Sequence, residues 1–210
     1  MLSNIHAVFG IFGWLHMTLI SCSSPGKTFY TDKACLDCTS PGMELIITAH
    51  ISYFINDIIS LKPIFGNGRL TNESSVHHAV GIVGLLSALL LGRIVGVFAI
   101  CLMITELSTI FLNNRSIMKE LSIIDDPKYA TFYFYNAVTL VITFFISRIV
   151  YLAIILVGYL LPSLFYYDYQ DAFKEIGWIK VRWAQTLMIC YFVLYIMNVY
   201  WFYKIIKAAR

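Results

Sequence analysis

The chain has 210 residues, of which 59% are hydrophobic and only 13% are charged, whereas an ordinary globular domain has about 25% charged residues. This composition excludes an ordinary soluble domain and indicates a polytopic membrane protein. The formal net charge of +3 is small and the basic residues lie scattered between apolar segments, so we expect no nucleic-acid partner.

Six apolar stretches are long enough to cross the hydrocarbon core of a membrane, which is about 30 Å thick and needs about 20 helical residues. We therefore predict an all-α fold, a polytopic bundle of six membrane-spanning helices that forms one domain over residues 1–210. The predicted crossings are Ile5–Cys22, Met43–Leu61, Val76–Leu91, Ile94–Leu112, Tyr129–Leu161 and Val181–Ile206.

The first stretch has two interpretations, a retained helix and the core of a signal peptide. Signal peptides normally begin with basic residues, and no Lys or Arg precedes this stretch, so we favour a retained helix. The loop that follows contains Cys35 and Cys38. A disulfide in an oxidising lumen, free thiols and a metal site all stay open for this pair, the metal site being the weakest because no second pair or His accompanies it.

The second stretch carries two ionisable residues, His50 and Asp57. Such residues cost about 2.5–3.5 kcal/mol each at membrane depth, so they persist mainly where they face a bundle interior or a wet cavity. They are seven residues apart and therefore lie on nearly the same face of a helix. For Asp57, a structural pair between helices and a direct role in a site both stay open.

The third and fourth stretches form a hairpin that we predict to contain the functional site. His77 and His78 are adjacent, so on a helix they point about 100° apart and do not form the metal site that His at i and i+4 would form. We expect one imidazole to face a cavity, while its neighbour orients it or contacts the next helix. Glu106, Thr109 and Asn113 repeat at helical spacing on the second arm, as one polar stripe that must face the interior.

The fifth stretch stays apolar for longer than one perpendicular crossing needs, which implies a steep tilt or a break. It contains Asn136 and Arg148. A buried arginine needs a partner, and the candidates are Glu106 and Asp57. The sixth stretch adds Asn198 to the polar residues expected in the interior.

Six crossings place both termini on the same side of the membrane. Lys and Arg are slightly more numerous on that side, so the positive-inside rule favours cytosolic termini and a lumenal loop with Cys35 and Cys38. Residues 163–180 mix Tyr, Trp and charged side chains, a composition typical of a segment at the membrane interface.

Short motifs distributed over these stretches carry a family likeness. They are Ile5-His6-Ala7-Val8, Ser52-Tyr53-Phe54-Ile55-Asn56-Asp57, His77-His78, Glu106-Leu107-Ser108-Thr109 with Phe111-Leu112-Asn113, Arg148-Ile149 and Met197-Asn198-Val199-Tyr200-Trp201. In this order they resemble the TLC-domain family, which includes ceramide synthases, translocon-associated membrane proteins and small transmembrane proteins linked to lipid homeostasis. The resemblance covers nearly the whole chain, which looks most like the small TLC-domain-containing proteins.

The resemblance implies a six-helix barrel around a lipid-sized chamber, with the histidine pair reaching into it. It also implies a multi-pass protein of the endoplasmic reticulum, and relatives usually carry one further crossing upstream. The sequence shows no terminal retrieval signal, so the plasma membrane stays open as the alternative. In the ceramide synthases, the His-His motif is tied to acyl transfer and a downstream His-Asp-x-x-Asp segment supports it. Laid on this chain, that segment falls on Thr105, Glu106 and Thr109, so one carboxylate is retained and the His and second Asp are absent.

Two functions from different classes stay open. In the first, the protein acts in lipid homeostasis and binds or moves a membrane lipid or acyl chain in a central cavity. The residues expected to line that cavity are His50, Asp57, His78, Glu106, Thr109, Asn113, Asn136, Arg148 and Asn198.

The second function is an acyltransferase of the ceramide synthase type, with acyl-CoA as a substrate. An imidazole with a carboxylate supplies the base or nucleophile that acyl transfer needs. The catalytic residues would be His77, His78, Glu106 and Asp57. We favour the first function because half of the synthase acid motif is missing, and we expect no cofactor and no metal. A scaffold for translocation or trafficking leaves the buried acids unexplained.

Overall fold

The computed structural model describes residues 2–19, 41–65, 69–91, 93–123, 126–162 and 178–209. Every regular element in these ranges is a helix, so the predicted all-α fold is confirmed. The main helices are α1 Leu2–Leu19, α2 Pro41–Phe65, α3 Arg69–Leu91, α4 Arg93–Leu102, α5 Glu106–Glu120, α6 Ala130–Phe144, α7 Tyr151–Ile155 and α10 Trp178–Ala209.

Within the described residues these helices join into six long rods. A 3₁₀ turn, Met103–Thr105, links α4 to α5. A π-helical segment, Phe145–Val150, links α6 to α7, and a second one follows at Leu156–Leu160. The long fifth stretch therefore continues as a helix whose turns are locally widened. Such widened turns occur often at functional sites.

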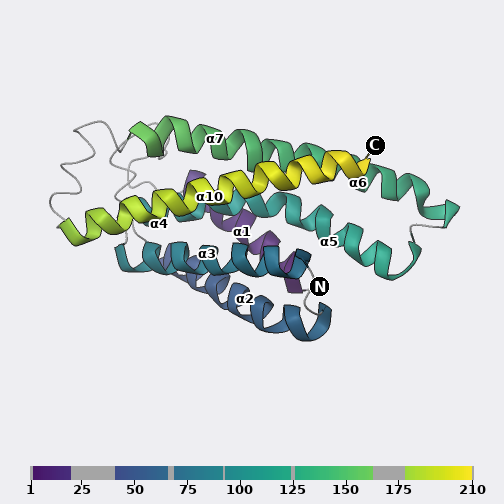
Figure 1. The fold of residues 1–210 in the computed structure, drawn as a ribbon, viewed down its shortest axis with the longest axis horizontal. Coiled ribbons are helices and arrows are strands. Elements are labelled where there is room, and N and C mark those ends of the chain that lie inside the picture. The colour runs from purple at the N-terminus through teal and green to yellow at the C-terminus, as the bar shows by residue number, and fades with distance from the viewer. Residues whose placement is uncertain are drawn as a thin grey trace.

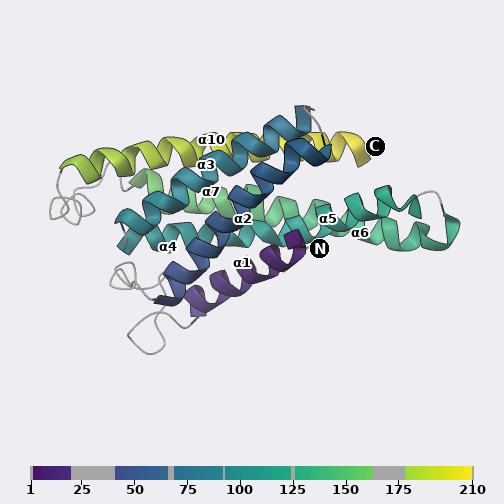
Figure 2. The ribbon, with the colours of Figure 1, turned by 90° about the horizontal axis from the view of Figure 1, so that it is seen from below.

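The six rods pack into a closed ring. Going around it, α1 contacts α2, α2 contacts α3, α3 contacts α10, α10 contacts α6, α6 contacts α5, and α5 contacts α1 again, while α4 also packs against α2 and α3. Figures 1 and 2 show the rods running along the long axis of the molecule, with both termini toward the same end. This placement agrees with an even number of crossings.

Four helical stretches in the described part of the chain are long and apolar enough to cross a membrane: Asn72–Leu91, Val95–Glu120, Pro127–Leu160 and Leu187–Ala208. They correspond to the last four predicted crossings. The first two predicted crossings coincide with α1 and α2 but are not among these four.

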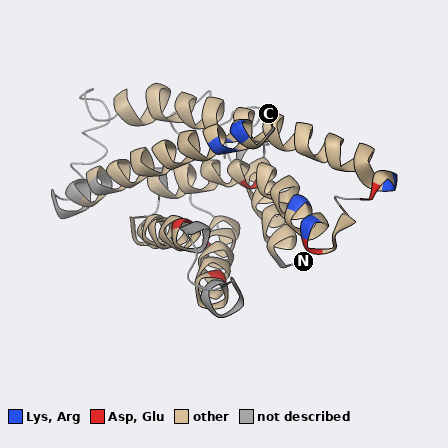
Figure 3. Cartoon of the chain, turned by 45° about the vertical axis from the view of Figure 1, so that its right-hand side comes forward, with Lys and Arg blue, Asp and Glu red and all other residues tan. Residues whose placement is uncertain are grey.

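The outer surface is also typical of a membrane protein. Large apolar side chains point outward from several helices, and Phe12, Leu90 and Ile189 are 64%, 75% and 66% exposed. Exposed large apolar side chains in such number mark contact with a membrane or a partner. Figure 3 shows that long parts of the described helices carry no charged residue. The chain is therefore a multi-pass integral membrane protein.

The structure corrects one predicted loop. The residues between the second and third predicted crossings, Lys62–Ser75, contain the helix breakers Pro63, Gly66 and Gly68 and are therefore expected to form a loop. In the structure only residues 66–68 fall between the ends of α2 and α3. The polar residues at the end of this range lie on α3, where Glu73 accepts hydrogen bonds from Trp201 and Lys204 of α10. Polarity here marks a contact between two helices rather than a helix end.

Two predictions lie largely or wholly outside the described residues. Cys35 and Cys38 are not described, and of the interfacial segment 163–180 only its last three residues are, as the first turn of α10. The state of the cysteine pair and the location of that segment stay predictions.

Candidate functional site

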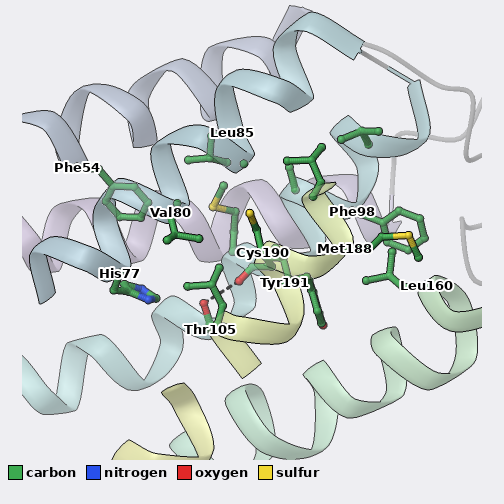
Figure 4. A pocket seen from close by; sticks show the side chains of 18 of the residues that line it. Phe54, His77, Val80, Leu85, Phe98, Thr105, Leu160, Met188, Cys190 and Tyr191 are labelled. Carbon is green, nitrogen blue, oxygen red and sulfur yellow. Dashed lines mark hydrogen bonds between the residues drawn. The ribbon is translucent and has the colours of Figure 1, made fainter. Parts of the chain in front are cut away.

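A cavity of about 170 Å³ lies between α3, α4, α10 and the end of the rod that contains α7. Figure 4 shows His77 at one end of it and Phe98, Leu160 and Met188 at the other, with Thr105 between. Most of the lining is apolar, and the cavity is partly open to its surroundings. The cavity therefore has one end with polar groups and a long apolar remainder.

Glu106 lines this cavity and is only 8% exposed. Its position follows from the 3₁₀ turn that joins α4 to α5, because Glu106 is the first residue of α5. The carboxylate accepts a hydrogen bond from Thr109, one turn along the same helix, and interacts electrostatically with Arg148. A buried carboxylate needs such partners, since an isolated buried charge is very costly.

Arg148 is the most extensively hydrogen-bonded side chain among the described residues. It is 6% exposed and lies in the π-helical segment after α6. Each of its three guanidinium nitrogens donates: Nε to the Thr105 carbonyl at 3.1 Å and to Ser108 Oγ at 2.8 Å, Nη1 to Asn198 Oδ1 at 3.2 Å, and Nη2 to Thr109 Oγ1 at 2.9 Å. These bonds join three of the six rods.

The partner expected for Arg148 was Glu106 or Asp57. The direct acceptors are instead hydroxyl, amide and carbonyl oxygens, and Glu106 is reached through Thr109. The Thr109 hydroxyl accepts from Arg148 and donates to Glu106, so one hydroxyl links the two opposite charges. The negative charge of Glu106 and the positive charge of Arg148 therefore balance each other.

A second polar cluster, formed by His6, His50 and Tyr53, packs behind Glu106. The rings of His6 and His50 have centroids 4.2 Å apart, and His6 stacks on Tyr53 at 3.7 Å. His50 Nδ1 lies 2.8 Å from the Ile46 carbonyl, which can only accept, so Nδ1 carries the proton and Nε2 is left as an acceptor. The Nε2 atoms of both histidines are buried without a hydrogen-bond partner.

His6 was missing from the predicted site. The signal that could have found it was available, since the first apolar stretch contains an ionisable residue at membrane depth and the first family motif includes it. Gly10, one turn further along α1, makes the contact feasible: a Cβ there would lie 2.7 Å from His50 Nε2 and 3.4 Å from Glu106 Cγ.

The adjacent histidines of α3 face different helices, as their angular offset predicts. His78 turns toward α2, where its Nδ1 lies 3.0 Å from Asp57 Oδ2 and its ring stacks on Phe54 at 4.6 Å. In this orientation His78 Nδ1 makes no well-formed hydrogen bond. The separation of 3.0 Å is nevertheless an ion-pair distance, and a small rotation of the ring would point the N–H at the Asp57 carboxylate. His77 contacts the ring of Trp201 on α10 and lines the cavity.

The remaining polar residues that we predicted tie helices together. Asn113 donates to Ser3 Oγ at 2.7 Å and to Asn4 Oδ1 at 2.9 Å, which fixes the start of α1 against α5. Asn136 donates to the Phe111 carbonyl at 3.0 Å.

Of the predicted cavity residues, Glu106 is the one that lines the cavity found among the described residues; the others lie in the surrounding networks. These others are His50, Asp57, His78, Thr109, Asn113, Asn136, Arg148 and Asn198. Whether any of them acts on a ligand stays a prediction. Within the described ranges, no group of three or more His, Cys, Asp or Glu side chains is placed to hold a metal ion.

A ring of helices with an apolar outer surface and a polar interior defines the class, a multi-pass membrane protein. The family follows from comparison with known families. The chain belongs to the TLC domain family, whose model matches residues 2–207, so the predicted family is confirmed. Searches of curated proteins and of solved structures gave no match.

Proposed function

We propose that the protein acts in lipid homeostasis by holding a membrane lipid with part of its acyl chain in the cavity between α3, α4 and α10. The observation that carries the proposal is the division of the cavity: His77, Thr105 and Glu106 contribute polar atoms, and apolar side chains form the rest. A lipid is divided in the same way, into a polar headgroup and an apolar chain. Membership of the TLC domain family supports a function connected with membrane lipids.

The dimensions also support an apolar guest. Apolar cavities of about 150 Å³ in soluble proteins stay dry and take up small hydrocarbons, and this cavity is of similar volume, about 170 Å³. Because it is partly open, a chain can extend from it into the surrounding membrane.

The proposal is tested by the lipids that the purified protein retains. Gly84 lines the cavity and faces open space, so in Gly84→Leu the new side chain fills the cavity. Gly158 also faces open space but is not among the lining residues, so Gly158→Leu is a matched control. We expect mass spectrometry to find a lipid with the wild type and Gly158→Leu, and several-fold less of it with Gly84→Leu. Equal retention by both variants contradicts the proposal.

An acyltransferase is the second candidate, favoured by one observation. His77 lines the same cavity as Glu106, and its Nδ1 is buried without a hydrogen-bond partner. A base or nucleophile must have such a free nitrogen. If this function is correct, purified protein releases CoA from acyl-CoA in the presence of an acceptor lipid, and His77→Asn abolishes the release while lipid retention persists. Lipid retention without CoA release supports lipid binding alone.

The membrane in which the protein works is a separate proposal. Family likeness favours the endoplasmic reticulum, and the plasma membrane is the alternative that we keep on separate grounds. Co-localisation of a C-terminally tagged chain with markers of the two membranes distinguishes them.

A further inference from the structure

We infer that the polar end of the cavity selects an uncharged lipid that ends in a hydroxyl, in preference to lipids of equal chain length that end in a carboxylate or an ammonium group. The inference rests on the proposed lipid binding and adds the chemical class of the ligand. It follows from which atoms the cavity offers and from the balance of charge behind them.

The oxygens that line the cavity accept hydrogen bonds. The Glu106 carboxylate can only accept. The Thr105 hydroxyl donates to the Leu102 carbonyl at 2.8 Å, and the Tyr191 hydroxyl donates to the Leu152 carbonyl at 2.8 Å. Neither hydroxyl proton is therefore available to a ligand, and both oxygens can only accept from one. His77, which also lines this end, has a buried Nδ1 without a hydrogen-bond partner, and a histidine ring can donate or accept. A hydroxyl, which both donates and accepts, fits all of these groups, whereas a carboxylate supplies no donor for the oxygens and faces the Glu106 carboxylate.

The charges behind the lining are already balanced. Glu106 is linked to Arg148 through Thr109, and all three nitrogens of the guanidinium donate to protein atoms. The described lining contains no Lys or Arg. A ligand carboxylate would thus face Glu106 without a free cation, and a ligand ammonium would add a second positive charge to a neutral pair. An unpaired buried charge is strongly unfavourable in either case.

The other titratable groups around this end leave that balance unchanged. On α1 and α2, the rings of His6 and His50 pack against each other, and their Nε2 atoms have no hydrogen-bond partner. Asp57 lies beside His78, and on the α3 and α10 side Glu73 lies 2.8 Å from Lys204. A hydroxyl is the donor that binds here without disturbing any of these pairs.

The test compares three probes of one chain length: hexadecanol, hexadecanoate and hexadecylammonium. Each is added to the purified protein in detergent at neutral pH, and native mass spectrometry measures the bound fraction. We expect hexadecanol to bind at least about tenfold more tightly than either charged probe, a difference of about 1.4 kcal/mol.

Substitution of Glu106 is expected to remove the preference for hexadecanol over hexadecanoate. Glu106→Gln keeps the size of the side chain and leaves Arg148 without its counter-charge, so hexadecanoate should gain about tenfold and equal or exceed hexadecanol. Glu44→Gln is the matched control, because Glu44 is exposed on α2 and away from the cavity; its ranking should be that of the wild type.

A double variant covers the case in which Glu106→Gln does not fold. Glu106→Gln with Arg148→Gln removes both charges and restores neutrality, so the preference for hexadecanol should return. Equal binding of the three probes by the wild type, or a preference for a charged one, overturns the inference while lipid binding stands. If none of the probes binds and no lipid is retained, the proposed function itself fails.

Discussion

At the scale of single residues, the Arg148 guanidinium is the centre of the buried polar network. It contacts acceptors from α5, from the 3₁₀ turn before it and from α10, so one cation fixes the relative position of three rods. In a bundle whose outer surface faces lipid, hydrophobic burial gives little direction to helix association, and hydrogen bonds of this kind contribute correspondingly more.

Removal of Arg148 is therefore expected to destabilise the protein strongly. Arg148→Met leaves Glu106 buried without its counter-charge, a change that typically costs about 3–5 kcal/mol. Arg148→Lys should recover only part of the loss, because an ammonium cannot reproduce the planar fork of donors. Thermal unfolding of the purified variants in detergent measures both effects.

Arg115 provides the comparison for that experiment. It is half-buried on α5 and donates a hydrogen bond to the Tyr133 hydroxyl at 3.2 Å. Arg115→Met should cost about 1 kcal/mol or less, the usual net value of one hydrogen bond. If Arg148→Met unfolds at the same temperature as Arg115→Met, the network around Arg148 does not stabilise the fold.

The sequence predicted which polar residues lie inside better than it predicted what they contact. Glu106 and Arg148 were expected in the interior because charges at membrane depth are costly, and both are buried. Their connection through Thr109 could not be predicted, because it depends on the widened turn that orients Arg148. His77 rather than His78 lines the cavity for a similar reason: the offset between them was known, but the rotation of α3 was not.

At the scale of elements, the close approach of α1 to the interior depends on glycine. Gly10→Ala places a Cβ 2.7 Å from His50 Nε2, whereas nothing lies within 4 Å of a Cβ at Gly158. We expect Gly10→Ala to lose about 1–3 kcal/mol from overpacking, in spite of the better helix propensity of alanine. Gly158→Ala should be neutral or gain up to about 1 kcal/mol.

Thermal unfolding of the two alanine variants tests this contact between α1 and α2. Similar melting temperatures for both variants contradict the tight contact at His50. The contact is hard to predict from the sequence because glycine at position 10 is also compatible with a loosely packed helix, and only the neighbour on α2 makes it necessary.

At the scale of the whole molecule, the closed ring determines which segments share a side of the membrane. Because successive rods run in opposite directions, the turn between α5 and α6 lies toward the end that carries both termini, as Figures 1 and 2 show. The predicted loop at residues 23–42 is then expected on the opposite side, and the positive-inside rule favours the cytosol for the side of the termini.

Epitope tags at three positions test this arrangement: after Ser122 in the turn between α5 and α6, after Arg210, and within residues 23–40. When only the plasma membrane is permeabilised, antibodies should reach the first two tags together, and the third only after all membranes are opened. The two rods that did not qualify as spans by length and composition, α1 and α2, make this test decisive. If α1 and α2 cross as a pair, the first two tags stay on the same side and the loop between α1 and α2 is protected. If they lie at one surface instead, all three tags become accessible together, and the ring has four crossings rather than six.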